Sequence, residues 1–418
     1  MTQRWVLDEI VDPFGAKVLV ERDAAGAVSS ARFDLAGLPR VDALLAGQPV
    51  TGVPNLVEKL CGICPAAHHL AGVRALEALA GSPELTPTAK AVRALLHYGS
   101  ALETHAPRLI STDRETALAM RRFGKAAMAA AGSPGHFPTT AVVGGVKTAV
   151  SPEARDGLAA TAAELLTQLV AVAVKQLQTP STLPVYAGAD VALVDPGASP
   201  DLLGERVRAV AASGATILSG ASASAWDGLV AEQYVGAPAP RPYLVALGPD
   251  HGRYRVGPMA QLRVGDLTTP IAAGLQRDWL AQSGDAGGAR AIMTVHAVEA
   301  IIALLDAPEL ISGEPTVEVG PCAPESVGVG WVDGPRGLLV HRYQTGADGR
   351  LTAAQILTPT AQNEPWLADL LLSAAAGSTA ALDLEDAVRE ADPCLPCSSA
   401  PVGGMGLQVD IVSADGGY

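Results

Sequence analysis

The sequence is poor in aromatic residues, in charge and in cysteine. Aromatic side chains make up 4% of its 418 residues and charged side chains 17%, whereas 49% of the residues are hydrophobic. So apolar an average is unusual for an exposed surface, and it indicates that a partner covers part of the exterior. The net charge is −14 and no basic stripe is visible, which argues against nucleic acid as that partner.

Neither a leader nor an uninterrupted membrane segment is visible in the sequence. Its first residues contain no apolar core of signal-peptide length and no twin arginine followed by one. The most apolar stretch, 158–177, contains Glu164, Gln168 and Lys175, so we predict a buried amphipathic helix there. These absences predict a cytoplasmic protein.

Apolar periodicity predicts an α+β fold: a single large, mainly helical domain over residues 1–418 with a central helix bundle. An N-terminal β element is expected around the turn at 23–26, and a β-hairpin at 337–357 with a shorter β run at 243–247. Ser151 is the expected N-cap of a long helix, because Pro152 follows it. The other expected helices cover 66–80, 87–104, 290–305, 365–375 and 382–390.

Four of the five cysteines form two Cys-x-x-Cys pairs near opposite ends of the chain, Cys61 with Cys64 and Cys394 with Cys397. A disulfide-stapled fold of this length would contain more cysteine, so thiols used for metal or redox chemistry fit better. Four thiolates favour zinc, an iron–sulfur cluster or nickel. Structural zinc sites usually separate the pairs by tens of residues, and a thioredoxin-like pair would explain one motif only; from spacing alone, zinc and a catalytic metal remain equally open.

The residues around the cysteines carry a family resemblance. Segments 54–68 (PNLVEKLCGICPAAH) and 392–397 (DPCLPC) resemble the two nickel motifs of [NiFe] hydrogenase large subunits. Segments 333–341 (DGPRGLLVH) and 358–363 (TPTAQN) are similar to motifs that lie between them in that family, as is the loop 135–145. Length and style are closest to the cytoplasmic NAD(P)-linked and sulfhydrogenase-type alpha subunits.

The resemblance implies a nickel–iron centre between residues 58–68 and 392–397, with iron that carries cyanide and carbon monoxide. The implied metal ligands are Cys61 and Cys394, terminal on nickel, and Cys64 and Cys397, which bridge nickel to iron. The implied catalytic groups are Arg336, over the open metal position, and the bridging thiols of Cys64 and Cys397.

Three further residues are implied to contact the cofactor: Pro335 beside Arg336, Thr360 as a hydrogen-bond donor to a cyanide, and His68 as a donor to a bridging sulfur. Each has a plainer reading, since Pro-Arg-Gly is a common turn and His68 fits an ordinary helix histidine. His69 is expected to be solvated, and Cys322 to be a small buried hydrophobe.

Two departures from the family pattern stand out. The segment 11–18 has no counterpart of the glutamate that usually relays protons, which leaves Asp12, Glu9, Glu58 and Asp333 as substitutes. Ala400 stands where the family usually has a histidine three residues after the last cysteine. Magnesium, which that histidine often binds, is therefore a doubtful cofactor, and so is removal of the C-terminal tail.

The resulting hypothesis is an oxidoreductase that catalyses H₂ ⇌ 2 H⁺ + 2 e⁻. One spare cysteine cannot hold an iron–sulfur relay, so we expect a separate iron–sulfur small subunit, with NAD(P)- or flavin-linked diaphorase subunits as further partners. The alternative is a non-catalytic or H₂-sensing relative, or a structural four-thiolate protein.

Overall fold

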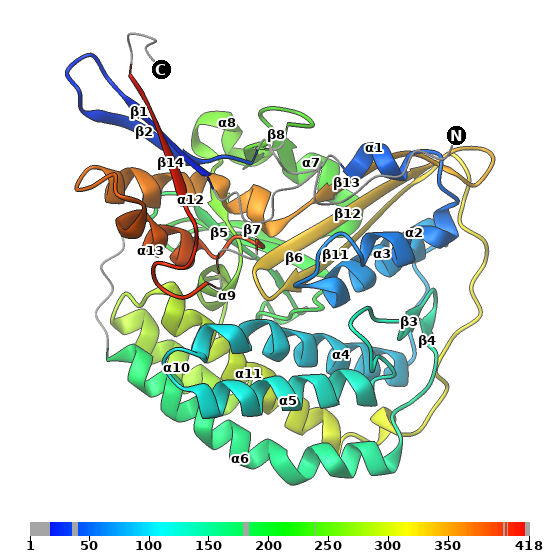
Figure 1. Cartoon of the computed structure of the whole chain (residues 1–418). Coiled ribbons are helices and arrows are strands. Elements are labelled where there is room, and N and C mark those ends of the chain that lie inside the picture. The colour runs from blue at the N-terminus through cyan, green and yellow to red at the C-terminus, as the bar shows by residue number, and fades with distance from the viewer. Residues whose placement is uncertain are drawn as a thin grey trace, which may run out of the picture.

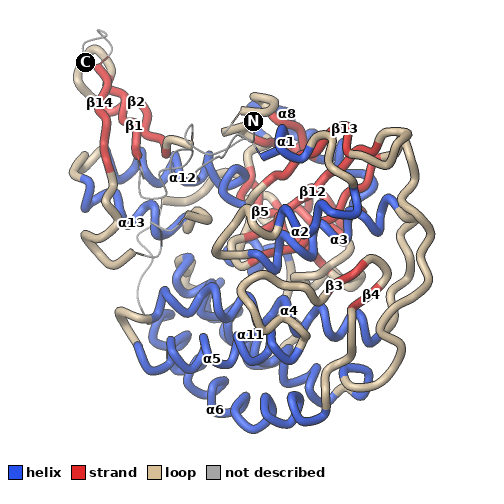
Figure 2. Tube along the Cα trace, turned by 45° about the vertical axis from the view of Figure 1, so that its right-hand side comes forward, coloured by secondary structure: helices blue, strands red, loops and turns tan. Residues whose placement is uncertain are grey.

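Helices form one half of the molecule, and small sheets with their covering helices form the other (Figures 1 and 2). The computed structural model describes residues 17–35, 41–178, 184–237, 239–395, 398 and 400–413. Over this part of the chain the expected mixture of a central helix bundle, an N-terminal β element and a hairpin near 337–357 is confirmed.

The helix bundle consists of five helices, each of which begins at a polar N-cap residue. Its members are α4 (Pro87–His105), α5 (Arg114–Ala130), α6 (Pro152–Leu177), α10 (Pro270–Ala281) and α11 (Ala286–Asp306). Ser151 caps α6 as predicted, accepting a hydrogen bond from the Ala154 amide, and Asp113 caps α5 in the same way. Helices α4 and α5 cross at Gly99 and Gly124, where a Cβ on Gly124 would lie 2.6 Å from the Gly99 carbonyl oxygen. Glycine therefore allows the two backbones to touch.

Helix α6 is less buried than predicted. It turns one stripe, with Leu158, Leu165 and Leu169 at its centre, towards the other helices, while most of its remaining residues face outward. Two helices of the described chain, α6 and α11, are long and apolar enough to cross a membrane. The most apolar window of α11 is 67% buried inside the protein and that of α6 is 28% buried, so α11 is a core helix and α6 a surface helix.

A three-stranded antiparallel sheet faces the bundle. Its strands are β11 (Val327–Gly334), β12 (Gly337–Thr345) and β13 (Leu351–Leu357). The last two are the predicted hairpin, and β11 is an additional strand. Helix α3 (Pro65–Leu79) packs directly on β11, because a Cβ at Gly330 would lie 2.2 Å from the Ala75 amide nitrogen. At the end of β11, a Cβ on Gly334 would lie 3.5 Å from the Cβ of Ala67, so the start of α3 lies beside the β11–β12 turn.

Shorter elements surround this sheet. A four-stranded sheet has the order β10-β5-β6-β7, and two small hairpins are β3–β4 and β8–β9. Their bounds are β3 (Ala141–Val142), β4 (Gly145–Val146), β5 (Ala189–Val194), β6 (Arg206–Val210), β7 (Thr216–Ser222), β8 (Val230–Glu232), β9 (Pro242–Leu244) and β10 (Tyr254–Arg255). The β run predicted at 243–247 ends at Leu244, and a 3₁₀ turn follows it. The short helices are α1 (Val41–Leu45), α2 (Val53–Val57), α7 (Trp226–Leu229), α8 (Gly248–His251) and α9 (Pro258–Val264).

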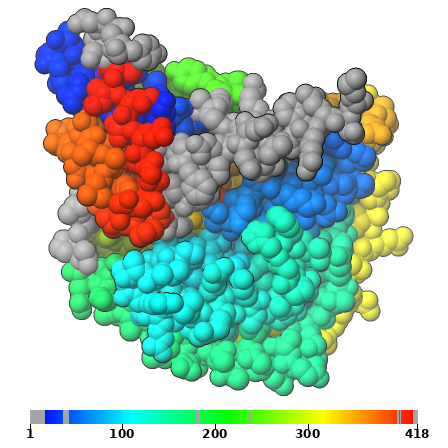
Figure 3. Space-filling view, in the orientation of Figure 1, coloured from blue at the N-terminus to red at the C-terminus, as the bar shows by residue number. Residues whose placement is uncertain are grey.

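The two ends of the described chain meet in one sheet. Strand β14 (Gln408–Ser413) pairs in parallel with β1 (Lys17–Arg22), which pairs with β2 (Val28–Phe33). Figure 3 shows this red C-terminal segment against the blue N-terminal hairpin and the orange helices. These helices are α12 (Pro359–Ala375) and α13 (Ala381–Ala391). The start predicted for α12 at Pro365 was wrong, because Thr358 caps the helix and Pro365 lies inside it.

A buried ion pair ties the loop at 135–145 to the core. Arg93 on α4 donates to both carboxylate oxygens of Glu77 on α3, at 3.0 and 2.6 Å, and to the carbonyls of Val142 and Gly145, each at 2.8 Å. The same carboxylate accepts from the Gly144 amide at 2.9 Å. The buried polar groups of this cluster hydrogen-bond to Arg93 or Glu77, so removing one of the two charges leaves the other charge and its neighbours buried without a partner.

We therefore expect Arg93→Ala to lower the free energy of unfolding by roughly 3–5 kcal/mol, since it leaves Glu77 buried without its partner. The measurement is the urea unfolding midpoint followed by circular dichroism. Arg121→Ala is the matched control, because Arg121 lies 3.9 Å from Glu103 with half of its side chain exposed, and such pairs contribute about 0–1 kcal/mol. Equal midpoints for the two variants would contradict a stabilising role of the Arg93–Glu77 ion pair.

Candidate metal centre

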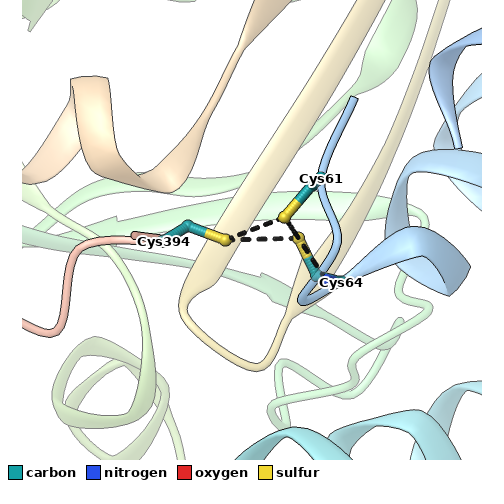
Figure 4. Close-up of side chains that lie close together, drawn as sticks. All are labelled: Cys61, Cys64 and Cys394. Carbon is teal, nitrogen blue, oxygen red and sulfur yellow. Dashed lines mark hydrogen bonds between the residues drawn. The ribbon is translucent and has the colours of Figure 1, made fainter. Parts of the chain in front are cut away.

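Three of the four predicted metal ligands meet at one point (Figure 4). Cys61 lies in the turn after α2, Cys64 is the N-cap of α3, and Cys394 follows α13. The sulfur of Cys61 lies 3.0 Å from that of Cys64 and 3.2 Å from that of Cys394, and Cys64 and Cys394 are 3.4 Å apart. Cys397, the fourth predicted ligand, lies outside the described residues.

The thiol cluster cannot be fully ionised without a cation. Hydrogen bonds from Cys394 and Cys64 hold the pKa of the Cys61 thiol well below its ordinary value. Hydrogen bonds with Cys394 and Cys61, together with burial, raise the pKa of Cys64, and the hydrogen bond with Cys61, together with burial, raises that of Cys394. One thiolate therefore forms readily, and the next two require a positive charge beside them.

The three sulfurs suit a bound metal. Their separations, at most 3.4 Å, are shorter than twice the thiolate–zinc bond of about 2.3 Å, so one ion of that size can contact all three. Among the described residues this is the one group of His, Cys, Asp and Glu side chains close enough to hold a metal ion. Soft thiolate donors of this kind bind nickel, iron or zinc rather than calcium or magnesium.

Arg336 lies beside the thiols, on the turn between β11 and β12. Its backbone is fixed by Gly257, because a Cβ at Gly257 would lie 2.7 Å from the Arg336 carbonyl oxygen. Burial lowers the pKa of Arg336, but the Asp392 carboxylate and the thiols of Cys394 and Cys64 outweigh this effect and raise the pKa above its ordinary value. The guanidinium is therefore charged. Its Nη1 is buried without a protein partner among the described residues, which leaves a donor for a group bound at the site.

Asp392 holds both Arg336 and the loop that carries Cys394. Its Oδ1 accepts from Arg336 Nε at 3.0 Å and from the Ser398 hydroxyl at 3.1 Å, and it also accepts from Arg108. Burial raises the pKa of Asp392, but Arg336 and Arg108 outweigh it and leave the pKa well below its ordinary value. Asp392 ends α13 in the left-handed region, at φ 47°, which turns the chain sharply towards Cys394.

The other predicted cofactor contacts adjoin these groups. Thr360, in the first turn of α12, accepts a hydrogen bond from the Cys394 amide at 2.7 Å. Its hydroxyl proton remains available to a second acceptor. Pro335 directly precedes Arg336 in the β11–β12 turn.

His68 is the first member of a buried hydrogen-bond chain. It hydrogen-bonds to the Cys61 sulfur and helps to lower the pKa of that thiol. Its Nδ1 lies 3.1 Å from His341 Nε2, and His341 Nδ1 lies 2.7 Å from the Tyr343 hydroxyl. Burial keeps the pKa of His341 well below its ordinary value, so this ring is neutral. One assignment satisfies all three contacts: Tyr343 donates to His341, His341 donates to His68, and His68 donates to the sulfur.

The remaining candidates lie elsewhere. The expectation that His69 is solvated was wrong: it is 2% exposed, and its Nδ1 lies 3.1 Å from the Glu58 carboxylate. The Asp333 carboxylate faces away from the thiols and accepts from the Leu193 amide and the Gln261 side chain, at 3.0 and 2.7 Å. Asp12 and Glu9 lie outside the described residues.

Sequence reasoning missed Arg108, His341 and Tyr343 as neighbours of the site. A histidine inside the apolar run of β12 was the available signal, because a buried polar side chain needs a partner. No local pattern marks Arg108, whose partner Asp392 lies 284 positions further along the chain.

No family model matches the sequence, but individual hydrogenase proteins do. One protein of the F420-non-reducing hydrogenase vhu of Methanococcus voltae is 28% identical over 86% of this chain and 94% of its own length. The beta subunit of the NAD-reducing hydrogenase HoxS of Cupriavidus necator is 26% identical over 100% of this chain and 98% of its own length. The alpha subunit of sulfhydrogenase 2 of Pyrococcus furiosus is 26% identical over 92% of this chain and 95% of its own length.

The fold leads to the same group of proteins. The structure of an NAD⁺-reducing [NiFe]-hydrogenase in the H₂-reduced state superposes with a TM-score of 0.79 and 28% identity, over 90% of this chain and 95% of the other. A [NiFeSe] hydrogenase from Desulfovibrio vulgaris Hildenborough shares the fold, with a TM-score of 0.68 and 19% identity. Matches to hydrogenase subunits along nearly the whole chain bear out the resemblance of its cysteine motifs to those of the [NiFe] hydrogenase large subunits.

Proposed function

We propose that this chain is the catalytic subunit of an enzyme that oxidises H₂ reversibly to protons and electrons. The observation that carries the proposal is the convergence of Cys61, Cys64 and Cys394 beside the buried guanidinium of Arg336, in a chain that matches [NiFe] hydrogenases over nearly its whole length. A structural zinc site needs no charged donor left without a protein partner at its edge, whereas a site that binds and turns over a small ligand does.

In this proposal the four cysteines hold nickel and iron. Cys61, Cys64, Cys394 and Cys397 would hold the nickel together with an iron that carries cyanide and carbon monoxide. When bound, the pair of metals supplies a Lewis-acidic, redox-active position for H₂. The protein supplies the thiolates, whose ionisation the metal charge and Arg336 favour together.

In this proposal the surrounding side chains orient and polarise the groups bound at the metal site. Arg336 directs its unpaired Nη1 donor at the bound group, beside Pro335, and Asp392 keeps the guanidinium in place. Thr360 fixes the Cys394 amide and has a hydroxyl proton for a cyanide. The hydrogen-bond chain from Tyr343 fixes the tautomer of His68, which then donates to Cys61.

Magnesium remains a doubtful cofactor. Ala400, at the position where the family usually has a histidine, has no side chain that can bind a metal. Its carbonyl accepts from Arg389 at 3.4 Å, and the Pro401 carbonyl accepts from the same guanidinium at 3.0 Å. A fixed side-chain cation therefore contacts this part of the tail.

We further propose that the electron-transfer partner is an iron–sulfur small subunit, with diaphorase subunits beyond it, in the cytoplasm. Cys322, the one cysteine outside the two pairs, lies 3.8 Å from the Leu76 carbonyl and belongs to a separate apolar cluster. The chain thus has no spare thiols for a cluster of its own.

Metal analysis with infrared spectroscopy tests the centre. We expect nickel and iron in the purified protein, with bands of iron-bound carbon monoxide and cyanide. Cys394→Ala should lose the nickel and the bands because a metal ligand is removed, while Cys322→Ala, the matched control, should keep both. Zinc without these bands would favour the structural four-thiolate alternative. Intact bands in a protein without H₂-dependent turnover would favour the sensing relative.

Arg336→Lys tests the guanidinium. Nickel content should stay near that of the wild type, and H₂-dependent dye reduction should fall roughly 100-fold or more, because lysine cannot reproduce the planar fork that places one N–H on Asp392 and another at the site. Arg342→Lys is the control on the same strand, since Arg342 pairs with Asp227 at the surface. Full activity in Arg336→Lys would remove Arg336 from the mechanism.

A further inference from the structure

The protons produced at a buried site need a titratable group that connects the site with water. This chain lacks the usual glutamate at 11–18, and the Asp333 carboxylate is occupied by Leu193 and Gln261. Asp392 is held ionised by two arginines. Neither of these two described carboxylates is therefore free to connect the site with solvent.

A small cavity adjoins the Arg336–Asp392 pair. Its volume is about 10 Å³, and its wall includes Arg336, Asp392, Arg290, Asn363 and Glu390. This volume corresponds to roughly one water molecule, and a buried water needs two to four polar partners. The charged and amide groups in the wall meet that requirement.

Glu390 lies between this cavity and the surface. It is in the last turn of α13, is partly exposed, and lines the cavity. One carboxylate oxygen accepts from the Ala286 amide at 2.5 Å at the start of α11. The Glu390 carbonyl accepts from Arg290 at 3.1 Å. These contacts hold the side chain at the cavity wall and leave its second oxygen for a proton.

The charges around Glu390 suit a proton carrier. Burial raises the pKa of this carboxyl above its ordinary value, and Asp285 and Asp392 raise it further. Arg290 and the Ala286 amide oppose this increase, and the pKa remains above its ordinary value. A carboxyl whose pKa lies above its ordinary value is better suited to accept a proton from the site and to release it to solvent.

We propose that Glu390 is the proton-exit residue of this enzyme, reached from the metal site through one water molecule in the cavity beside Arg336 and Asp392. This inference rests on the proposed function. For each H₂ the H–H bond breaks, two electrons leave to the acceptor, and two protons leave in turn. Each proton passes to the water, then to the Glu390 carboxylate, and then to solvent, so that Glu390 returns to its ionised state. Asp392 lines the same cavity.

Glu390→Gln is the decisive variant. We expect unchanged nickel and iron content and unchanged infrared bands, because Glu390 is no metal ligand. Conversion of para- to ortho-hydrogen, which requires cleavage of H₂ but no exchange with water, should persist. Exchange of D₂ with water and H₂-driven viologen reduction should both fall about 100-fold, the contribution typical of a proton-transfer group.

The pH profile separates a proton-transfer role from a structural one. Wild-type H₂ oxidation should decline as the pH falls through the raised pKa of Glu390, because a protonated Glu390 cannot accept. Glu390→Asp should retain turnover with this acidic limb moved to lower pH, and Glu390→Gln should be slow without the limb. In the metal-free chain, the carboxyl infrared band missing from Glu390→Gln should titrate in the wild type above the ordinary pKa of glutamate.

Two controls make the result specific. Asp386→Asn removes an exposed carboxylate from the same helix and should change neither exchange nor turnover. Glu58→Gln tests the other buried carboxylate near Cys61. Full D₂ exchange in Glu390→Gln, or loss confined to Glu58→Gln, would overturn the proposal. Glu390→Gln could fail to assemble the metal centre. In that case the proposal is tested by Glu390→Asp: an acidic limb at the same pH as in the wild type would overturn it. A wild-type protein with the centre but no H₂ oxidation would instead refute the proposed function.

Discussion

The buried ion pair between Arg336 and Asp392 joins the two loops on which the site depends. One loop is the turn between β11 and β12, and the other carries Cys394. Neither charge has enough exposed surface to be stabilised by water, so each requires the other. Because Asp392 also accepts from Arg108 and Ser398, the pair connects the bundle, the central sheet and the C-terminal loop. Loss of either charge would therefore loosen the ligands and the cation together.

The sequence predicted the elements whose residues repeat with a regular apolar period. Helices α4, α6 and α11 of the bundle and the hairpin at 337–357 were found in this way, whereas α5 and α10 were not predicted. Strand β11 was missed because Gly328 and Gly330 occupy alternate positions where a strand usually carries side chains that pack. These glycines are needed because α3 approaches the strand at backbone distance, a requirement that only the tertiary contact reveals.

The same limit applies to the site. The cysteine spacing and the motifs around it indicated where the thiols would meet, since these depend on local turns. The groups around the thiols come from distant segments, as Arg108 and Tyr343 illustrate, and their roles follow from burial. His68 and His69 are neighbours in the sequence with the same apparent freedom, yet one contacts a thiol and the other a carboxylate. The two side chains leave the buried first turn of α3 in different directions, which causes this difference.

The pairing of β14 with β1 sets an order of events during synthesis. The first strand of the sheet is among the earliest described segments to leave the ribosome, and the strand that completes it is among the last. Contacts between such distant segments form late, because the long intervening chain must first be ordered. Cys394 is translated shortly before β14, so the pair Cys61 and Cys64 exists for most of translation with its other ligands missing. The metal pocket can close only after nearly all of the chain has been made.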